Sequence, residues 1–280
     1  MRILILLLIL TSCAGSKEFS GRDPKFTTYV INLDRAPQRL EYMDRLLSYH
    51  RMKFERISAI DGYLTEITDL ETGEKFLGQD LKNKKISLTQ NKKYHINCIS
   101  ALKDKNLPKS FEAVNYMHHV ASKPMTAGEM GCTCSHRFIY QKLLNSNDDI
   151  AVIFEDDLKV KTTEFPYILS NIIGQLPKNS IAFLDAWGPS IENIKRNQDN
   201  RALFINLSHS PQIFGLYAVV IDRNFASHLL KAGDVESYPI DIRVSQEITN
   251  GKVGGYLANK RSVSFNGNLG SDINNMGRHH

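Results

Sequence analysis

Apolar and polar positions near the start of the chain follow strand and helix periods in turn. Residues 27–33 form the β-rich run Thr-Thr-Tyr-Val-Ile-Asn-Leu, which predicts a first strand. Residues 37–49 carry apolar side chains at spacings of three and four, which predicts a helix with one apolar face. Apolar residues return over 54–60, as expected for a second strand, and stop at Asp61-Gly62, a turn dipeptide. Strand, helix and strand in this order indicate the start of an α/β arrangement.

The same alternation continues through the second half of the chain. One helix is predicted through 138–145 and another over 225–230. Continuous apolar runs, typical of buried strands, occupy 150–154, 181–184 and 214–221. This order of elements predicts an α/β sandwich built on a largely parallel sheet.

Periodicity fades over residues 64–124, which we interpret as an insertion. Residues 82–109 contain eight Lys against one acid, Asp104. Such a charge run is commonly a solvated surface, and it is also the kind of surface that binds an anionic acceptor or a membrane. Both interpretations are open at the level of the sequence.

The N-terminal residues 1–24 stand apart from the folded region, which we expect over 25–275, with a frayed tail at 276–280. The longest uninterrupted apolar run is far short of the roughly 20 residues that span a bilayer. A charged start, an apolar stretch and small residues have the layout of an export signal, and Leu-Thr-Ser-Cys13 resembles a lipobox. A membrane-surface anchor or a mis-started frame are the alternatives. The expected location is membrane-associated, either through lipidated Cys13 or at the cytoplasmic face of an inner membrane.

Composition limits the class of protein. Hydrophobic residues make up 42% and charged residues 23% of the 280 residues, which excludes global disorder. A net charge of +5 is too small to indicate a nucleic-acid partner, and none is expected. Four Cys in a chain of this length argue against a disulfide framework.

Three consecutive acids follow the apolar run at 150–154. Glu155, Asp156 and Asp157 would lie at the carboxyl edge of the sheet, where open α/β folds bind ligands. Neighbouring carboxylates repel one another, and Mg²⁺ or Mn²⁺ with oxygen ligands relieves that repulsion. The sequence therefore predicts a metal site here, with Asp157 the first choice of ligand and a solvated acidic turn as the alternative.

A second polar segment combines Gly128, Glu129, Ser135 and His136 just before the predicted helix. We expect the glycine to let the backbone approach a ligand, and the polar side chains to supply hydrogen bonds at a helix start. A helix entry that packs without a ligand is the alternative, since a capping Ser is common. The Cys-x-Cys spacing in this segment is too short for a zinc pair, and adjacent Ser and His do not face each other as nucleophile and base.

Taken together, these motifs resemble glycosyltransferase family 25, which includes bacterial lipooligosaccharide galactosyltransferases and the catalytic modules of collagen galactosyltransferases. The resemblance rests on seven short blocks in a fixed order: Val-Ile-Asn-Leu-Asp-Arg at 30–35 with Arg39, Ala-Ile-Asp-Gly at 59–62, Thr-x-Gly-Glu-x-Gly-Cys-x-x-Ser-His at 126–136, Glu-Asp-Asp at 155–157, Gly-x-Tyr-Ala at 215–218, Pro-x-Asp at 239–241 and Ser-Asp-Ile at 271–273. Individually the blocks are short, but their order is specific.

The resemblance implies a nucleotide-diphosphosugar transferase (GT-A-like) α/β fold with a central, mostly parallel sheet. It also implies Mn²⁺ (or Mg²⁺), a UDP-sugar donor and inversion at the sugar carbon. The acids at 155–157 would take the place of the family's metal and diphosphate motif. Asn32, Asp34, Arg35 and Arg39 would lie near the nucleotide. The long segment 64–124 departs from the family and leaves acceptor recognition open.

The expected reaction moves a hexose, with galactose the favoured sugar, to a hydroxyl of a glycan or glycolipid such as lipooligosaccharide. We assign the general base to Asp241, because Pro239 stiffens the segment that holds it. Asp185, at the end of 181–184, is the rival, and a plain helix N-cap is the alternative role for Asp241. A catalytically silent carbohydrate-binding module and a metal-dependent phosphohydrolase are the competing functions.

Overall fold

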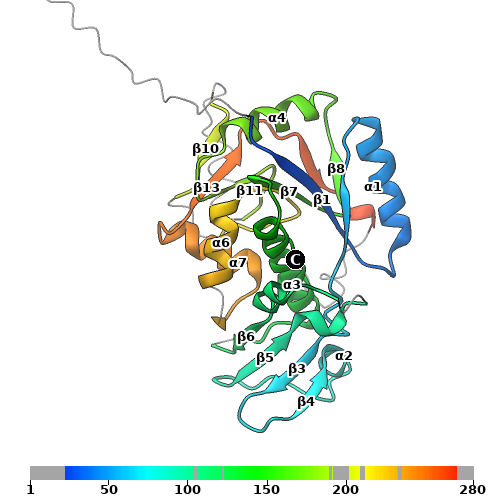
Figure 1. Cartoon of the computed structure of the whole chain (residues 1–280), viewed down its shortest axis with the longest axis vertical. Helices are drawn as coiled ribbons and strands as arrows, with labels where there is room; N and C mark the ends of the chain where they lie inside the picture. The colour runs from blue at the N-terminus through cyan, green and yellow to red at the C-terminus, as the bar shows by residue number, and fades with distance from the viewer. Residues whose placement is uncertain are drawn as a thin grey trace, which may run out of the picture.

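The structure, a computed structural model, describes residues 23–103, 106–121, 123–188, 191, 202–208, 212–232 and 235–269. A seven-stranded sheet forms the body of the molecule and carries helices on both faces (Figure 1). A five-stranded sheet lies beyond one end of the long helix α3 (Figure 1). Export-signal, lipobox and tail predictions, including Cys13, fall outside the described residues, as does the 271–273 block.

The elements follow one another in the order predicted for an α/β chain, with additional strands. They are β1 (Phe26–Asn32), α1 (Pro37–Tyr49), β2 (Glu55–Ser58), β3 (Glu66–Asp69), β4 (Lys75–Leu77), α2 (Gly78–Lys82), β5 (Lys93–Asn97), η1 (Cys98–Ala101), η2 (Lys109–Val114), β6 (Tyr116–His119), α3 (Ala127–Asn145), β7 (Ile150–Glu155), β8 (Leu158–Val160), α4 (Phe165–Gln175), β9 (Ser180–Phe183), β10 (Phe204–Asn206), β11 (Ala218–Asp222), α6 (Arg223–Ala232), β12 (Val235–Glu236), α7 (Ile240–Thr249), β13 (Gly254–Ala258), β14 (Val263–Phe265) and η3 (Gly267–Leu269).

The α/β class is confirmed, but the expectation of a mostly parallel sheet is not. Strand order in the large sheet is β10-β13-β9-β11-β7-β1-β2, with three parallel and three antiparallel pairings. β11 runs against both of its neighbours. Its pairing with β9 is extended by an antiparallel bridge between Trp187 and Phe214. The sheet is therefore mixed.

Two apolar layers enclose the large sheet. On one face, side chains of β1 and β7 such as Val30 and Phe154 pack with α1 and α4. On the other, Tyr29 and Ile153 pack with α3, α6 and α7. Alternate residues of a strand point to opposite faces, so a continuous apolar run is what a strand buried on both faces requires.

Residues 64–124 are largely folded rather than a solvated loop. β3, β4, β5 and β6 pair with β12 from much later in the chain, in the order β12-β6-β5-β3-β4. Their inward residues, with Met130 and Cys134 of α3, form a separate apolar core. Within it a disulfide joins Cys98 to Cys134, so this sheet is fixed covalently to α3. Among the described residues, the helices are all too short or too polar to cross a membrane.

Candidate functional site

A pocket opens where the carboxyl ends of β1, β2 and β7 meet the N-terminal half of α3. The parallel register sets Ile31 level with Glu155, and Asn32 level with Ser58, so polar residues after each strand reach one edge. Its polar and glycine lining includes Arg35, Arg39, Asp61, Gly62, Tyr63, Gly128, Gly131, Cys132, Ser135, His136, Glu155, Asp156 and Asp157. Residues more than a hundred positions apart in the sequence thus share one cavity.

Close backbone packing explains two of the glycines in these motifs. A Cβ on Gly62 would come within 1.7 Å of the Ala127 carbonyl oxygen, and one on Gly131 within 2.6 Å of the Gly62 nitrogen. Gly78 approaches Gly62 equally closely, since its Cβ would lie 1.9 Å from the Gly62 oxygen. These glycines let the turn after β2 lie directly against α3, which forms one wall of the pocket.

The start of α3 is a capping box, which gives Glu129 and Ser135 structural partners. The Glu129 N–H donates to Thr126 Oγ1 at 3.2 Å, and the Thr126 N–H donates to Glu129 Oε2 at 2.8 Å. Ser135 Oγ accepts from the Ile60 N–H at 2.9 Å and donates to the Gly131 carbonyl at 2.7 Å. Glu129 does not line the pocket, whereas Ser135 does while holding the turn after β2 in place.

Asp156 is held by two neighbours from the first strand and helix. Asn32 Nδ2 donates to Asp156 Oδ2 at 2.6 Å, and Arg39 Nη1 lies 3.1 Å from Asp156 Oδ1. Burial raises the pKa of Asp156 even though both partners favour its ionised form. Both carboxylate oxygens are therefore engaged by protein groups, and Asn32 acts behind the pocket wall.

Asp157 has the opposite environment. Its side chain is 5% exposed, and Oδ1 has no hydrogen-bond partner among the described residues. Burial, together with the carboxylates of Glu155 and Asp156, raises the pKa of Asp157 to about 8. A buried carboxylate oxygen without a donor, beside two further carboxylates, fits a divalent cation with oxygen ligands. Asp157 and Glu155 are the residues that would hold it.

His136 and Cys132 face the same carboxylate from α3. His136 Nε2 lies 3.3 Å from Glu155 Oε1, and Cys132 Sγ lies 3.8 Å from the same oxygen. Burial and the nearby carboxylates of Glu155 and Asp241 raise the pKa of the Cys132 thiol well above its usual range. Neutral thiol and buried imidazole thus border the acidic edge of the sheet.

Two arginines give the pocket its positive charge. Arg35 forms an ion pair with Asp61 and stacks over Tyr63, with 5.4 Å between its guanidinium carbon and the ring centroid. Arg39 adds a second guanidinium through its contact with Asp156. Guanidinium groups beside carboxylates suit an anionic ligand that also binds a cation, such as a diphosphate.

Asp34 does not belong to the pocket lining. Its carboxylate lies 2.6 Å from Lys103 Nζ and 2.6 Å from Arg56 Nη2, and accepts from Ser58 Oγ at 2.8 Å. These partners hold the pKa of Asp34 well below its usual range. Asp34 joins the exit of β1 to β2 and to the following sheet.

The two carboxylates predicted as general bases differ in their partners. Asp185 is 2% exposed and accepts from Tyr217 at 2.7 Å and from Arg261 Nε at 3.0 Å. Asp241 lies in the first turn of α7, where Pro239 is the N-cap, so Asp241 is not the capping residue. The preceding residue, Ile240, donates its N–H to Thr133 Oγ1 of α3 at 3.3 Å, so Asp241 lies beside the helix that carries Cys132. Neither carboxylate is among the pocket-lining residues.

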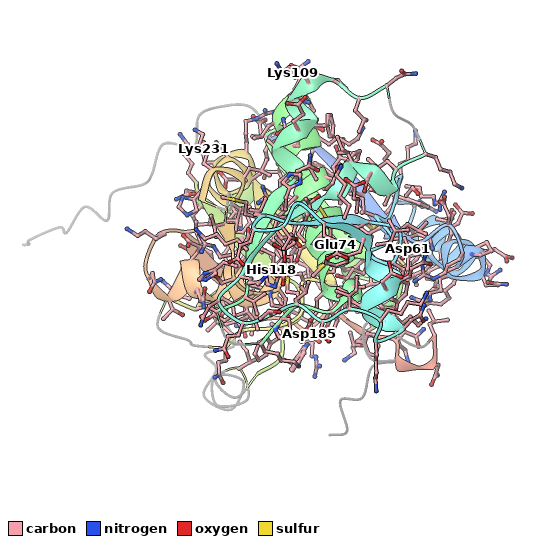
Figure 2. All side chains as sticks on the ribbon, turned by 90° about the horizontal axis from the view of Figure 1, so that it is seen from below. Asp61, Glu74, Lys109, His118, Asp185 and Lys231 are labelled. Atoms are coloured by element: carbon pink, nitrogen blue, oxygen red, sulfur yellow. A yellow bond between two sulfur atoms is a disulfide. The ribbon has the colours of Figure 1, made fainter. Side chains whose placement is uncertain are left out.

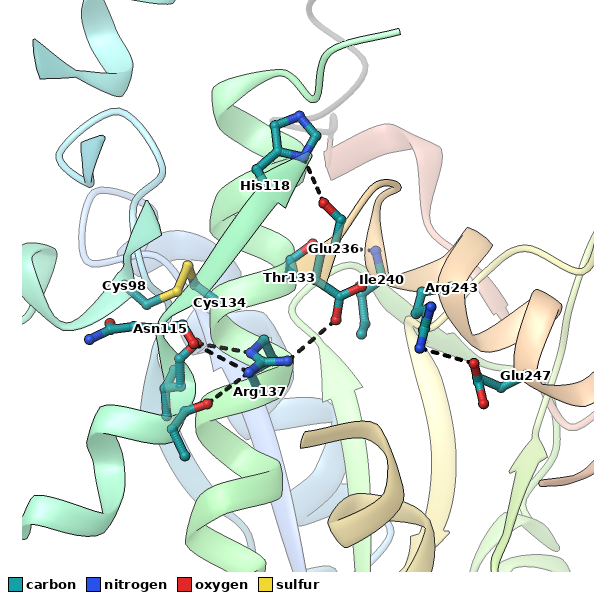
Figure 3. Close-up of polar contacts among 12 residues, drawn as sticks. Cys98, Asn115, His118, Thr133, Cys134, Arg137, Glu236, Ile240, Arg243 and Glu247 are labelled. Carbon is teal, nitrogen blue, oxygen red and sulfur yellow. Dashed lines mark hydrogen bonds and ion pairs between the residues drawn. A yellow bond between two sulfur atoms is a disulfide. The ribbon is translucent and has the colours of Figure 1, made fainter. Parts of the chain in front are cut away.

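A buried polar network behind the pocket fixes α3 and the start of α7 (Figure 3). Arg137 of α3 donates to the Val114 carbonyl at 2.9 Å and lies 3.3 Å from Glu236 of β12. The Ile240 N–H, at the first residue of α7, donates to Thr133 Oγ1 at 3.3 Å. Both sheets and α7 are therefore aligned by one helix.

Sequence reasoning missed Cys132, Asp61 and Tyr63 as pocket residues. The Cys-x-Cys spacing excludes a zinc pair made of Cys132 and Cys134, but Cys134 instead bonds to Cys98 and leaves Cys132 as a single thiol. The signal was its four-residue spacing from His136, which places two metal-binding side chains on one helical face. Asp61 and Tyr63 flank Gly62, which the sequence indicates as a turn and as part of a block of the family resemblance, without a role in the site.

Comparison with known proteins places these motifs among sugar transferases. The sequence profile of Glycosyltransferase family 25 (LPS biosynthesis protein) matches residues 26–215, which include every pocket residue but neither Asp241 nor Arg261. A protein of Aedes aegypti described as "Glycosyltransferase 25 family member" is 25% identical over 132 residues. That similarity covers 47% of this chain and 16% of the relative, so the chain spans a small part of the relative's length.

Proposed function

We propose, from the premise that the chain belongs to glycosyltransferase family 25, that it transfers a hexosyl group from a nucleotide-diphosphosugar to a glycan or glycolipid hydroxyl. A UDP-sugar is the proposed donor, galactose the proposed sugar, and lipooligosaccharide the proposed class of acceptor. A GT-A-like relationship of the large sheet and a membrane-associated location belong to the same proposal. The proposed location follows from the proposed acceptor, because lipooligosaccharide is a glycan linked to a membrane lipid.

One observation carries the proposal. The family blocks around Arg35, Gly62, Gly131, His136 and the acids at 155–157 converge on a single pocket that contains both guanidinium and carboxylate groups. A nucleotide diphosphate needs cationic groups to neutralise its negative charge. Guanidinium groups can do this directly, and a pair of carboxylates can hold a divalent cation that does it as well. Mn²⁺ or Mg²⁺ at Glu155 and Asp157 would neutralise charge on the departing diphosphate.

The chain's own residues would position and deprotonate the acceptor. In the proposed displacement, the acceptor oxygen bonds to the anomeric carbon while the bond from that carbon to the diphosphate oxygen breaks, which inverts the carbon. Asp241 takes the acceptor proton, because Asp241 is only half-buried whereas Asp185 is buried beneath Tyr217 and Arg261. Arg39 and Asn32 keep Asp156 oriented, and Arg35 approaches the anionic end of the donor.

Donor turnover with and without an acceptor tests this function. Purified full-length protein is incubated with several UDP-hexoses, with or without a glycan acceptor, in Mn²⁺ or in excess chelator. We expect acceptor-dependent UDP release that the chelator abolishes, with a product one hexose heavier by mass spectrometry. Sugar binding without UDP release would indicate a silent binding module. Phosphate release from phosphate esters without sugar transfer would indicate a phosphohydrolase.

A further inference from the structure

We propose that Cys132, His136 and Glu155 form a three-ligand site for a thiophilic divalent cation such as Zn²⁺. This site differs in chemistry from the oxygen-ligand site proposed for Glu155 and Asp157. Binding of such a cation requires no transferase activity, so it goes beyond the proposed function.

Local structure brings the three ligands together. Cys132 and His136 are four residues apart on α3, so both side chains lie on the helical face that meets the end of β7. Each offers one ligand atom, and with a Glu155 oxygen these atoms all lie within 4.8 Å of one another. A loop cluster would need ordering before binding, whereas these residues sit on a helix and a strand that are already packed.

Two of the ligand separations are close to those of a tetrahedral zinc site. Bonds of about 2.0 Å to nitrogen and oxygen and about 2.3 Å to sulfur imply ligand separations of about 3.3 Å for N to O and about 3.5 Å for S to O. His136 Nε2 lies 3.3 Å from Glu155 Oε1, and Cys132 Sγ lies 3.8 Å from it. The separation from Nε2 to Oε1 already fits, Sγ would move toward Oε1 by about 0.3 Å, and Sγ and Nε2 start within 4.8 Å of each other.

The chemistry of the donors favours zinc over magnesium. Thiolate sulfur and imidazole nitrogen are ligands of borderline-soft cations, while Mg²⁺ keeps oxygen ligands and water. His136 is fully buried, and its Nε2 faces the Glu155 carboxylate. Cys132 and Glu155 line the pocket, which provides an entry route and leaves the fourth position open.

Binding forms a sulfur–metal bond at the expense of the thiol S–H bond. The proton of Cys132 leaves to solvent, and no electron is transferred. Because Glu155 is shared with the oxygen-ligand site, a bound thiophilic ion would compete with Mn²⁺ in the same pocket.

Cobalt spectroscopy on the full chain provides the test. The protein is freed of metal with chelator, kept without reductant so that the Cys98–Cys134 disulfide stays intact, and titrated with Co²⁺ and then Zn²⁺. We expect a thiolate-to-cobalt charge-transfer band that Zn²⁺ removes. Cys132→Ser should abolish the band and weaken Zn²⁺ binding at least about 10-fold, since even partners outside the ligand set cost that much. Cys13→Ser, the matched control, should keep both.

A second measurement needs no variant. Zn²⁺ at about ten times its Kd should slow alkylation of Cys132 about 10-fold, as read by peptide mass spectrometry, because the thiol is then unbound in only about a tenth of the molecules. Absence of the charge-transfer band, a band that persists in Cys132→Ser, or equal alkylation rates with and without Zn²⁺ would each overturn the proposal. UDP release in Mn²⁺ reports separately on the transferase.

Discussion

Asp156 and Asp157 are adjacent residues of one type with different partners. Asp156 is held by Asn32 and Arg39, while Asp157 Oδ1 has no partner in the described residues. A carboxylate whose charge is already offset by protein groups binds a cation weakly. A buried carboxylate without a partner destabilises the folded protein unless a cation binds it. The sequence predicts the three acids after 150–154 as one metal-binding group. Only their contacts in the folded protein distinguish Asp156 from Asp157.

Asp157→Asn should therefore raise stability and abolish metal-dependent turnover together. Removing this carboxyl should raise the midpoint of thermal unfolding in chelator at neutral pH by about 2–4 °C, the shift that about 1 kcal/mol gives, because a raised pKa means that ionisation of the group favours the unfolded state. Mn²⁺-dependent UDP release should fall to background. Calorimetry and the donor assay measure both effects. Asp156→Asn is the control and should raise the midpoint less than Asp157→Asn, because Asn32 and Arg39 offset part of the cost of burying the Asp156 carboxylate. Wild-type turnover in Asp157→Asn would exclude Asp157 as a ligand.

Asp241→Asn separates a general base from a structural carboxylate. Proton removal by a positioned side chain contributes about 10²- to 10⁴-fold, so kcat should drop within that range while donor and metal affinities stay unchanged. Asp185→Asn should mainly lower thermal stability, because Tyr217 and Arg261 lose a buried acceptor. Steady-state kinetics beside thermal melts decide between them. Full activity in Asp241→Asn would move the base to Asp185.

At the scale of elements, the sequence predicted the helices and strands that have a clear apolar period. It missed the strands that depend on pairing with strands elsewhere in the chain. α1 at Pro37–Tyr49 and β7 at Ile150–Glu155 appear where the pattern places them. α3 starts at Ala127, earlier than its apolar spacing indicated, because a capping box and two close-packed glycines define its first turns. Thr-x-x-Glu at 126–129 is the signal that identifies this start.

Strand direction and the second sheet required information that periodicity lacks. An apolar run has the same pattern whichever way the strand runs, so the antiparallel placement of β11 could not be read from 214–221. β5 does alternate between buried and more exposed side chains, with Tyr94 and Ile96 buried between polar residues. The surrounding lysines led us to interpret this segment as an insertion and not as a strand. Its neighbour β6 pairs with β12, a partner more than a hundred residues later. The same holds for the site residues. The motif blocks are local and can be recognised in the sequence, whereas the role of Cys132 could be assigned only once it was known that Cys134 bonds to Cys98.

β12 contacts α3 through the carboxyl group of Glu236, which lies beside Arg137 (Figure 3). Protonation of this carboxyl should make the stability of the protein depend on pH. Glu236 is fully buried, and burial outweighs Arg137 and Arg243 so that the pKa of Glu236 rises from 4.5 to about 7. A raised folded-state pKa means that its stabilising contribution is complete below pH 4.5 and is lost as the pH rises through about 7.

Glu236→Gln should remove that pH dependence. Relative to the variant, the wild type should lose about 3 kcal/mol of unfolding free energy between pH 4.5 and pH 8, from the size of the shift. Urea unfolding at several pH values measures this difference. Glu41→Gln, which removes an exposed pair with Arg45, is the control and should leave the pH profile unchanged. Parallel profiles for wild type and Glu236→Gln would contradict the raised pKa.

At the scale of the whole molecule, α3 joins two sheets with separate cores. Arg137 links it to η2 and β12 by polar contacts, and the Cys98–Cys134 disulfide closes a separation of 36 residues. The sequence argument against a disulfide framework holds for the large core, which is apolar. A single bridge serves the smaller sheet, whose limited core gains most from a cross-link.

Replacing both Cys98 and Cys134 by Ala should lower the free energy of unfolding by about 3–4 kcal/mol, the chain-entropy value for a closed loop of 36 residues. Urea denaturation without reductant measures the loss. Cys132→Ala serves as the control, because that thiol is not bonded to another cysteine in the structure. Equal stabilities for the double variant and the wild type would mean that the two sulfurs are not joined in solution.

The Lys-rich segment is divided by the fold into lysines near the pocket and lysines far from it. Lys82 Nζ lies 4.5 Å from the ring centroid of Tyr63, which lines the pocket, and Lys84 and Lys85 follow directly after α2. Lys109 projects from a distant edge of the molecule, away from Asp61 (Figure 2). Lys92 and Lys103 are paired with acids, and Lys85 lies 3.9 Å from Asp80, so the eight-to-one imbalance of the sequence overstates the free positive charge.

An anionic acceptor that approaches the pocket should therefore meet Lys82, Lys84 and Lys85 first. Changing these three to Gln should raise the acceptor's KM and flatten its dependence on salt, because exposed charges are screened over a Debye length of about 10 Å at 0.1 M. The donor's KM should not change, since Arg35 and Arg39 lie inside the pocket. Kinetics at several salt concentrations measure each effect, with Lys109→Gln as a control that should match the wild type. If the triple variant behaves like this control, the segment is a solvated surface and the acceptor reaches the pocket from another side.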